Sequence, residues 1–167
     1  MEYGKQNNLN ITSLKKEERT IACNAIITKN KDGKQYFLLG LRAKNKSGGG
    51  QWGLIGGTQT TGEMMEETLK RELFEEIGIN VALSDIKWNN FFQCIATEKV
   101  HFDHHGFVIE NWTGEIENKE PNKCDELKWF SEEDLPLDNF FVSKGNLVNY
   151  LNDVKYNTQT NFDYRAR

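Results

Sequence analysis

Three glutamates in one short stretch have the residue type and spacing for cation chemistry. Glu72, Glu75 and Glu76 stand at positions i, i+3 and i+4, which would place them on one face of a helix. Carboxylates that close repel one another, so a helix gains no stability from the arrangement. A divalent cation would reverse the sign, because Mg²⁺ is bound by carboxylate oxygens together with substrate phosphates. The trio therefore predicts either a metal site for phosphate chemistry or a solvated acidic face.

The segment that carries these glutamates is expected to be a helix over residues 64–77. It contains no glycine or proline and is rich in helix-favouring residues. Its apolar residues recur every four positions and predict a face packed on a core: Met65, Leu69, Leu73 and Ile77. Gly78 is expected to end the helix. Arg71 lies four residues from both Glu67 and Glu75, so it could orient a carboxylate by a fork-shaped contact or form a surface ion pair.

A longer pattern surrounds the acidic trio. From Gly57 the chain reads glycine, five residues, Glu63, seven residues, Arg-Glu-Leu, one residue, Glu-Glu, one residue and Gly78. This pattern resembles the signature of the Nudix hydrolases, with every fixed position filled. The resemblance implies an α/β fold, namely the Nudix-type α/β/α sandwich with a mixed sheet between helices. It also implies hydrolysis of a phosphoanhydride bond in a nucleotide, with Mg²⁺ or Mn²⁺ as the cofactor.

A weaker likeness extends over residues 20–151. The segment NKEPNKC, followed by ELKWF and EDLP, is similar to the MutT-like subgroup of nucleoside triphosphate pyrophosphohydrolases. That likeness implies a nucleoside triphosphate substrate, cleaved to the monophosphate and pyrophosphate. The metal ligands that it implies are Glu72, Glu75, Glu76, the backbone of Gly56, and Glu120.

The resemblance also assigns roles to residues around the metal. It leaves open whether Glu75, Glu76 or Glu120 takes the proton from water, and it gives Glu63 and Arg71 supporting roles in catalysis. Three further residues are expected to bind substrate: Arg42, Gly57 and Asn139. Gly56 and Gly57 allow a tight turn and close backbone approach to a ligand or metal. Arg42 ends a predicted strand beside a glycine-rich loop and is expected to contact phosphate.

Asn139 carries two alternative interpretations. It matches the position from which some MutT-like relatives read a purine edge, and an asparagine offers both a donor and an acceptor to a base. The alternative is a helix cap. Two departures from the family pattern, Ile55 in place of a proline and Thr60 in place of a glutamate, spare the acidic trio and bear on substrate subclass.

Other functions remain open at this stage. One is a pyrophosphatase of a linked nucleoside diphosphate such as ADP-ribose. Another is a non-catalytic nucleotide sensor, although such sensors usually lose signature carboxylates and all are present here. The cluster His101, Asp103, His104 and His105 invites a zinc interpretation, but no matching ligand pair follows it. We expect one or two of these side chains to face the pocket.

Composition bounds the remaining possibilities. The length of 167 residues predicts a single domain, with loose ends at about residues 1–18 and 155–167. The net charge of −4 argues against a broad surface for long nucleic acid or membrane. Three separated cysteines, with no apolar run of membrane length and no signal peptide, indicate a cytoplasmic protein. Related proteins suggest a homodimer.

The remaining elements follow from alternation and turn residues. Strands are expected over residues 20–28, 35–42, 52–55, 80–88, 91–97, 107–113 and 127–130, and a second helix over about 143–154. Asp32-Gly33 is a hairpin signal between the first two strands.

Overall fold

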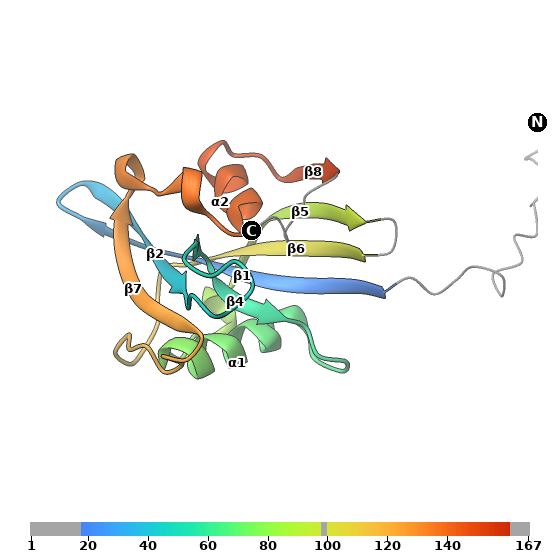
Figure 1. The fold of residues 1–167 in the computed structure, drawn as a ribbon. Coiled ribbons are helices and arrows are strands. Elements are labelled where there is room, and N and C mark those ends of the chain that lie inside the picture. Colours follow the sequence, from blue (N-terminus) through green and yellow to red (C-terminus); the bar gives the residue numbers. More distant parts are fainter. Residues whose placement is uncertain (1–17, 98–99, 161–167) are drawn as a thin grey trace, which may run out of the picture.

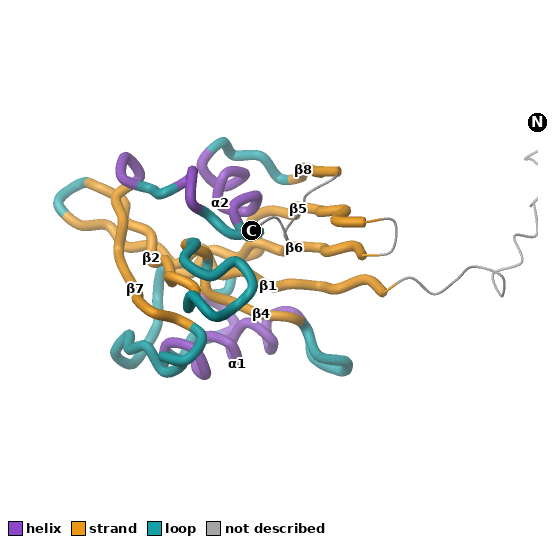
Figure 2. The backbone as a smooth tube through the Cα atoms, in the orientation of Figure 1, coloured by secondary structure: helices purple, strands orange, loops and turns teal. Residues whose placement is uncertain are grey.

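A mixed sheet between two helices forms the body of the molecule. The structure, a computed structural model, describes residues 18–97 and 100–160. Its eight-stranded sheet has the order β3-β2-β1-β6-β5-β8, with β4 paired to β1 and β7 paired to β2. The pairs β1–β6 and β5–β8 are parallel and the others are antiparallel. Helices α1 and α2 cover opposite sides of the strands (Figures 1 and 2). The predicted sandwich with a mixed sheet is confirmed.

The elements have the following bounds. The strands are β1 Glu18–Lys31, β2 Lys34–Arg42, β3 Trp52–Gly53, β4 Ile55–Thr58, β5 Lys87–Thr97, β6 Val100–Ile109, β7 Cys124–Ser131 and β8 Tyr156–Thr160. The helices are α1 Met65–Ile77 and α2 Lys144–Leu151, with short 3-10 turns η2 Leu83–Asp85, η3 Glu132–Asp134 and η4 Leu137–Asn139. Among the described residues, no helix has both the length and the apolar character needed to cross a membrane.

Strand β1 runs through the centre of the sheet and contributes to both cores. Cys23, Ala25 and Ile27 pack in the cluster that includes the apolar face of α1. Ile26 packs in a second cluster that includes Leu147 of α2. Alternate side chains of a strand point to opposite faces, so a strand covered on both faces reads as a nearly continuous apolar run. Asn24 interrupts that run.

Helix α1 forms as its sequence predicts. Leu69, Leu73 and Ile77 are buried against the sheet, and the chain leaves the helix at Gly78 in a left-handed conformation with φ 77°. The Asp32-Gly33 hairpin is also present between β1 and β2. These features follow from local periodicity and turn chemistry, and they hold the acidic trio on the face of α1 away from the core.

Three sequence predictions need correction. Residues 80–88 form the 3-10 turn η2 and the start of β5 rather than one strand. Strand β6 ends at Ile109, before the predicted limit of 113. The predicted loose tail from 155 is wrong for residues 156–160, which form β8 and pair in parallel with β5. This segment, YNTQT, lacks apolar alternation, and its place at the sheet edge is marked by Tyr156 stacking on Phe91 at 5.4 Å between ring centroids. The rest of both predicted loose ends, residues 1–17 and 161–167, lies outside the described residues.

A neighbouring pair on α1 tests the packing. Leu73 is fully buried, whereas Phe74 is 56% exposed. Leu73→Ala should lower the free energy of unfolding by about 2–5 kcal/mol, because it removes buried methyl groups and leaves a cavity. Phe74→Ala should change it by no more than about 0.5 kcal/mol. Urea unfolding followed by circular dichroism measures both, and equal effects of the two substitutions would contradict this packing of α1.

Candidate functional site

One arginine organises the acidic face of α1. The Arg71 guanidinium binds both carboxylate oxygens of Glu63, from Nε at 2.8 Å and from Nη2 at 3.1 Å. Its Nη1 donates to Glu72 at 2.6 Å and to Glu75 at 3.3 Å. The expected fork-shaped contact therefore exists, but it falls on Glu63 before the helix. Glu67 instead accepts a hydrogen bond from the backbone amide of Met64 at the helix start.

The contacts of Glu63 fix its charge. Hydrogen bonds from Arg71 and then from Thr68 lower the pKa of Glu63 to about 2, while the bond to Glu63 raises the pKa of Arg71. Glu63 therefore stays ionised and holds Arg71 in place. This is the supporting position that the signature assigns to it.

Strand β4 lies directly against the trio. The Gly56 amide donates to Glu76 Oε2 at 3.2 Å. Gly56 has φ 147°, and a Cβ there would overlap the carbonyl oxygen of Cys23. A Cβ on Gly57 would overlap the Glu72 carboxylate. Glycine at both positions is therefore required by the close approach of β1, β4 and α1.

Glu76 is the carboxylate at this junction whose pKa is raised. Burial is the largest cause and raises its pKa to about 7, with smaller contributions from the charges of Glu72 and Glu120 and an opposing hydrogen bond from Gly56. A desolvated carboxylate among other carboxylates favours its neutral form unless a cation compensates.

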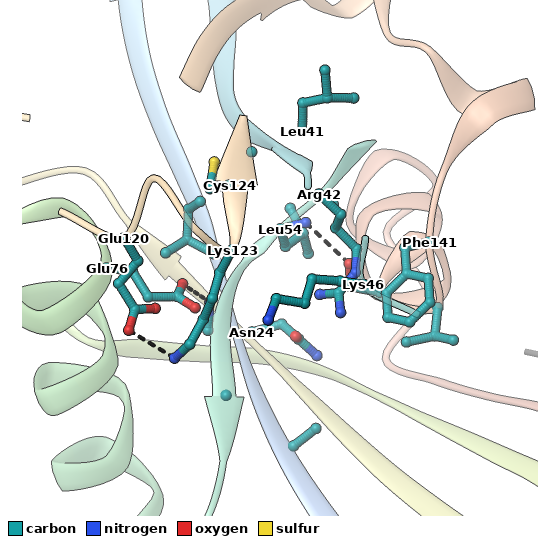
Figure 3. Close-up of a pocket in the computed structure, with 18 of the residues that line it drawn as sticks. Asn24, Leu41, Arg42, Lys46, Leu54, Glu76, Glu120, Lys123, Cys124 and Phe141 are labelled. Carbon is teal, nitrogen blue, oxygen red and sulfur yellow. Dashed lines mark hydrogen bonds and ion pairs between the residues drawn. The ribbon is translucent and has the colours of Figure 1, made fainter. Parts of the chain in front are cut away.

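A cavity of about 360 Å³ opens beside this junction. Figure 3 shows Glu76 and Glu120 with Lys123 at one end, and Arg42, Lys46 and Phe141 at the other. Gly56, Gly57 and Thr58 also line it. The volume is in the range of small-molecule sites, and the wall carries negative charge at one end and positive charge at the other.

The positive end is built by the end of β2 and the loop that follows. Arg42 donates from Nε to the Ser47 carbonyl at 2.9 Å, and its guanidinium carbon lies 4.2 Å from the centre of the Phe141 ring. Burial lowers the pKa of Arg42 from its usual value. The predicted position of Arg42 facing the glycine loop is confirmed, and its contact with phosphate stays a prediction.

Glu120 reaches the cavity from the loop before β7. It lines the wall together with Glu76 and accepts a hydrogen bond from Lys123 Nζ at 2.7 Å. That bond raises the pKa of Lys123. The structure thus brings Glu120 to the signature carboxylates, 44 positions after Glu76 in the sequence.

Asn139 lies elsewhere. It is exposed, is not among the cavity-lining residues, and donates from Nδ2 to the Gly50 carbonyl at 2.9 Å. The alternative of a helix cap is wrong, since α2 begins at Lys144 after Ser143. In this structure Asn139 ties the glycine-rich loop to η4, and its role in reading a base stays a prediction.

Several cavity residues were not singled out from the sequence. They are Asn24, Lys46, Lys123, Cys124 and Phe141. Asn24 could have been singled out from the sequence, because a polar residue in a strand buried on both faces needs a hydrogen-bond partner. The histidines were expected to send one or two side chains to the pocket, and His104 lines it. His105 faces the other side of β6, where its Nδ1 accepts from Trp88 Nε1 at 3.3 Å.

The oxygen donors at the junction fit a hard divalent cation in type, since carboxylates and backbone carbonyls are what Mg²⁺ accepts. Within the described part of the chain, no three His, Cys, Asp or Glu side chains converge closely enough to complete a metal site. Instead, Arg71 pairs with Glu72 and Glu75, and Lys123 pairs with Glu120. Side-chain rotation of these carboxylates would have to accompany cation binding.

Comparisons with known proteins agree with this geometry. The model of the NUDIX domain matches residues 18–151. An oxidized purine nucleoside triphosphate hydrolase from Danio rerio is 34% identical over 102 residues, which is 60% of this chain and 61% of the relative. The nucleoside triphosphatase NudI of Salmonella agona (strain SL483) is 46% identical over 70 residues, 41% of this chain and 46% of the relative. The chain thus spans about half to three fifths of the length of these curated relatives.

Among solved structures, a MutT NUDIX hydrolase from Burkholderia pseudomallei superposes with a TM-score of 0.62 at 30% identity. The match covers 72% of this chain and 88% of that one.

The raised pKa of Glu76 predicts a pH dependence of the protein in a metal chelator. The pKa of Glu76 in the folded protein, about 7, exceeds the ordinary value of 4.5, so the folded state holds an extra proton between these pH values. The stabilisation is complete below about pH 4.5 and is lost as the pH rises through about 7. Its size is about 3 kcal/mol.

Glu76→Gln should remove this component. The unfolding free energies of wild type and variant are measured by urea titration with EDTA from pH 4.5 to 8. The wild-type value minus the variant value should fall steadily as the pH rises toward about 7. A difference that stays constant over that range would refute the assigned burial of Glu76.

Proposed function

Because this chain belongs to the Nudix hydrolase family, we propose that it hydrolyses a nucleoside triphosphate to the monophosphate and pyrophosphate with Mg²⁺ or Mn²⁺. The observation that carries the proposal is the junction of α1 and β4. There Glu76 lines a cavity whose opposite end carries Arg42 and Lys46, while Glu72 and Glu75 of the same helix are bound by Arg71 outside the cavity wall. The names of the curated relatives, which are nucleoside triphosphate hydrolases, support the substrate class.

The carboxylates would hold the cation. Glu72, Glu75 and Glu76 are the proposed ligands, with Glu120 and the Gly56 backbone as further donors from the cavity wall. A divalent cation bound there supplies charge neutralisation on the phosphates and activates water for attack. Arg71 would keep the carboxylates oriented through its bond to Glu63, and one of Glu75, Glu76 and Glu120 would take the proton from water.

The cationic end of the cavity would bind the substrate phosphates. Arg42 is held by the Ser47 carbonyl and by the Phe141 ring, so little side-chain entropy is lost when its remaining N–H groups meet an oxyanion. Lys46 lines the same end. The Gly57 backbone also lines the cavity and allows close approach of the ligand.

The proposal predicts the effect of removing one signature charge. Glu75→Gln should keep the fold and lower kcat for Mg²⁺-dependent pyrophosphate release by about 100-fold or more, because an uncharged amide is a poor ligand for the cation. Glu67→Gln is the matched control on the same helix. Its side chain accepts the Met64 amide, glutamine preserves that contact, and the activity should stay at the wild-type level. Wild-type turnover in Glu75→Gln would refute the assignment.

The products separate this function from the other two. A triphosphatase of this kind releases pyrophosphate, whereas a pyrophosphatase of ADP-ribose or a similar linked diphosphate releases two monophosphates. A sensor binds nucleotide in Mg²⁺ or Mn²⁺ without product. A panel of nucleotides scored by chromatography of the products therefore decides among them.

The cytoplasmic location and the homodimer stay predictions.

A further inference from the structure

A chain of buried polar side chains lies beneath the cavity on the α2 side of the sheet. Its members come from β1, β5, β6 and α2, and all are buried: Asn24, Asn90, His104, Asn146 and Asn149. Buried polar groups are normally hydrogen-bonded, and a network of them fixes the orientation of each member. Two of these residues, Asn24 and His104, also line the cavity.

The orientation of Asn146 follows from a backbone group. Its side-chain nitrogen lies 3.1 Å from the His104 carbonyl oxygen and 2.8 Å from Asn90 Oδ1. A backbone carbonyl can only accept a hydrogen bond, so the donor must be the amide nitrogen of Asn146. The side-chain oxygen of Asn146 therefore faces Asn24 and accepts from Asn24 Nδ2 at 2.9 Å.

This fixes the tautomer of His104. Asn24 Nδ2, now assigned as a donor, also lies 3.2 Å from His104 Nδ1, so that ring nitrogen accepts. A neutral imidazole that accepts at Nδ1 carries its proton on Nε2. Burial lowers the pKa of His104 to about 4, against a smaller opposing influence of Asp103, and the ring is therefore neutral near pH 7.

The Nε2–H group is left unsatisfied. It is buried and has no hydrogen-bond partner among the residues that the structure describes. An unsatisfied buried donor destabilises the protein, so a ligand that supplies an acceptor to it would bind more tightly than one that does not. Over the same described range, no hydrogen bond uses the side-chain oxygen of Asn24. The unsatisfied donor and this oxygen thus belong to two side chains that line the cavity.

The surroundings favour a neutral, flat ligand group. The rings of Phe92 and Phe102 lie 5.9 and 5.8 Å from the His104 ring, and Phe102 also lines the cavity. A charged phosphate would be desolvated there without a cation, whereas a base carbonyl or ring nitrogen needs only a neutral donor. Figure 3 shows Asn24 between the two charged ends of the cavity.

We infer that His104 is a specificity-determining residue whose Nε2–H donates to an acceptor atom of the substrate base, oriented for that task by Asn24 and Asn146. The inference rests on the proposed function only in that the ligand is a nucleotide. It adds the recognition of the base to a site whose charged ends act on phosphates and metal.

Binding without turnover tests the inference separately from catalysis. Calorimetric titration with α,β-methylene nucleoside triphosphates in Mg²⁺ compares wild type, His104→Phe and His105→Phe. His104→Phe keeps an aromatic ring and should weaken the best-bound analogue by about 5- to 100-fold while leaving the affinity for tripolyphosphate, which has no base, unchanged. His105→Phe changes the next residue on the opposite face of β6 and should bind every analogue as wild type does.

A spectroscopic measurement on the wild-type protein removes any dependence on variant folding. Long-range ¹H–¹⁵N correlation spectra of histidine-labelled protein should show His104 protonated at Nε2, and its resonance should move with the nucleotide analogue but not with tripolyphosphate. An unmoved His104 resonance, or wild-type affinity of His104→Phe for every analogue, overturns the inference. Failure of wild type to release pyrophosphate would refute the proposed function and leave this binding result standing.

Discussion

The site depends on one guanidinium that holds three carboxylates in place. Arg71 contacts Glu63, Glu72 and Glu75 within 3.3 Å, and a single positive charge cannot neutralise all of them. The surplus of negative charge, to which the half-buried Glu76 adds when it is ionised, is what a divalent cation would balance. Repulsion that would weaken an ordinary helix is tolerated because the opposite face of α1 is buried in the core.

The central strand β1 links the two halves of the site. Toward α1 it packs Cys23, Ala25 and Ile27, and its pairing with β4 brings Gly56 and Gly57 against the carboxylates. Toward α2 it presents Asn24 to the buried polar network. One face therefore borders the proposed phosphate and metal site, and the other borders the proposed site for the remainder of the ligand. The cavity is lined both by residues of the α1–β4 junction, such as Gly56 and Glu76, and by Asn24 and His104 of the polar network.

Local sequence was sufficient for the parts of the fold that depend on local physics. The periodicity of Leu69, Leu73 and Ile77 predicted the buried face of α1, and the glycine after it predicted the helix end. It was insufficient for β8, whose polar residues form a strand only because β5 offers an open edge. That edge exists only after distant strands have paired, so no local pattern could report it.

The same division applies to the site. The signature spacing identified Glu63, Arg71 and the acidic trio. It did not predict that the two-point contact of Arg71 is made with Glu63, because that contact forms only when the turn before α1 folds back. The link from Asn24 through Asn146 to His104 joins residues 80 to 122 positions apart, and spacing alone carries no information at that range. Asn139 was assigned from resemblance, and the structure places it at the end of η4, where it donates to the glycine-rich loop and lies outside the cavity wall.

The central claim is that the acidic trio exists to hold a cation next to a nucleotide. The most direct measurement is anomalous diffraction from crystals grown with Mn²⁺ and an α,β-methylene nucleoside triphosphate. We expect anomalous peaks that place manganese within coordination distance of oxygens of Glu72, Glu75 and Glu76 and of the nucleotide phosphates. An ordered nucleotide in the cavity with no manganese peak beside those three side chains would contradict it.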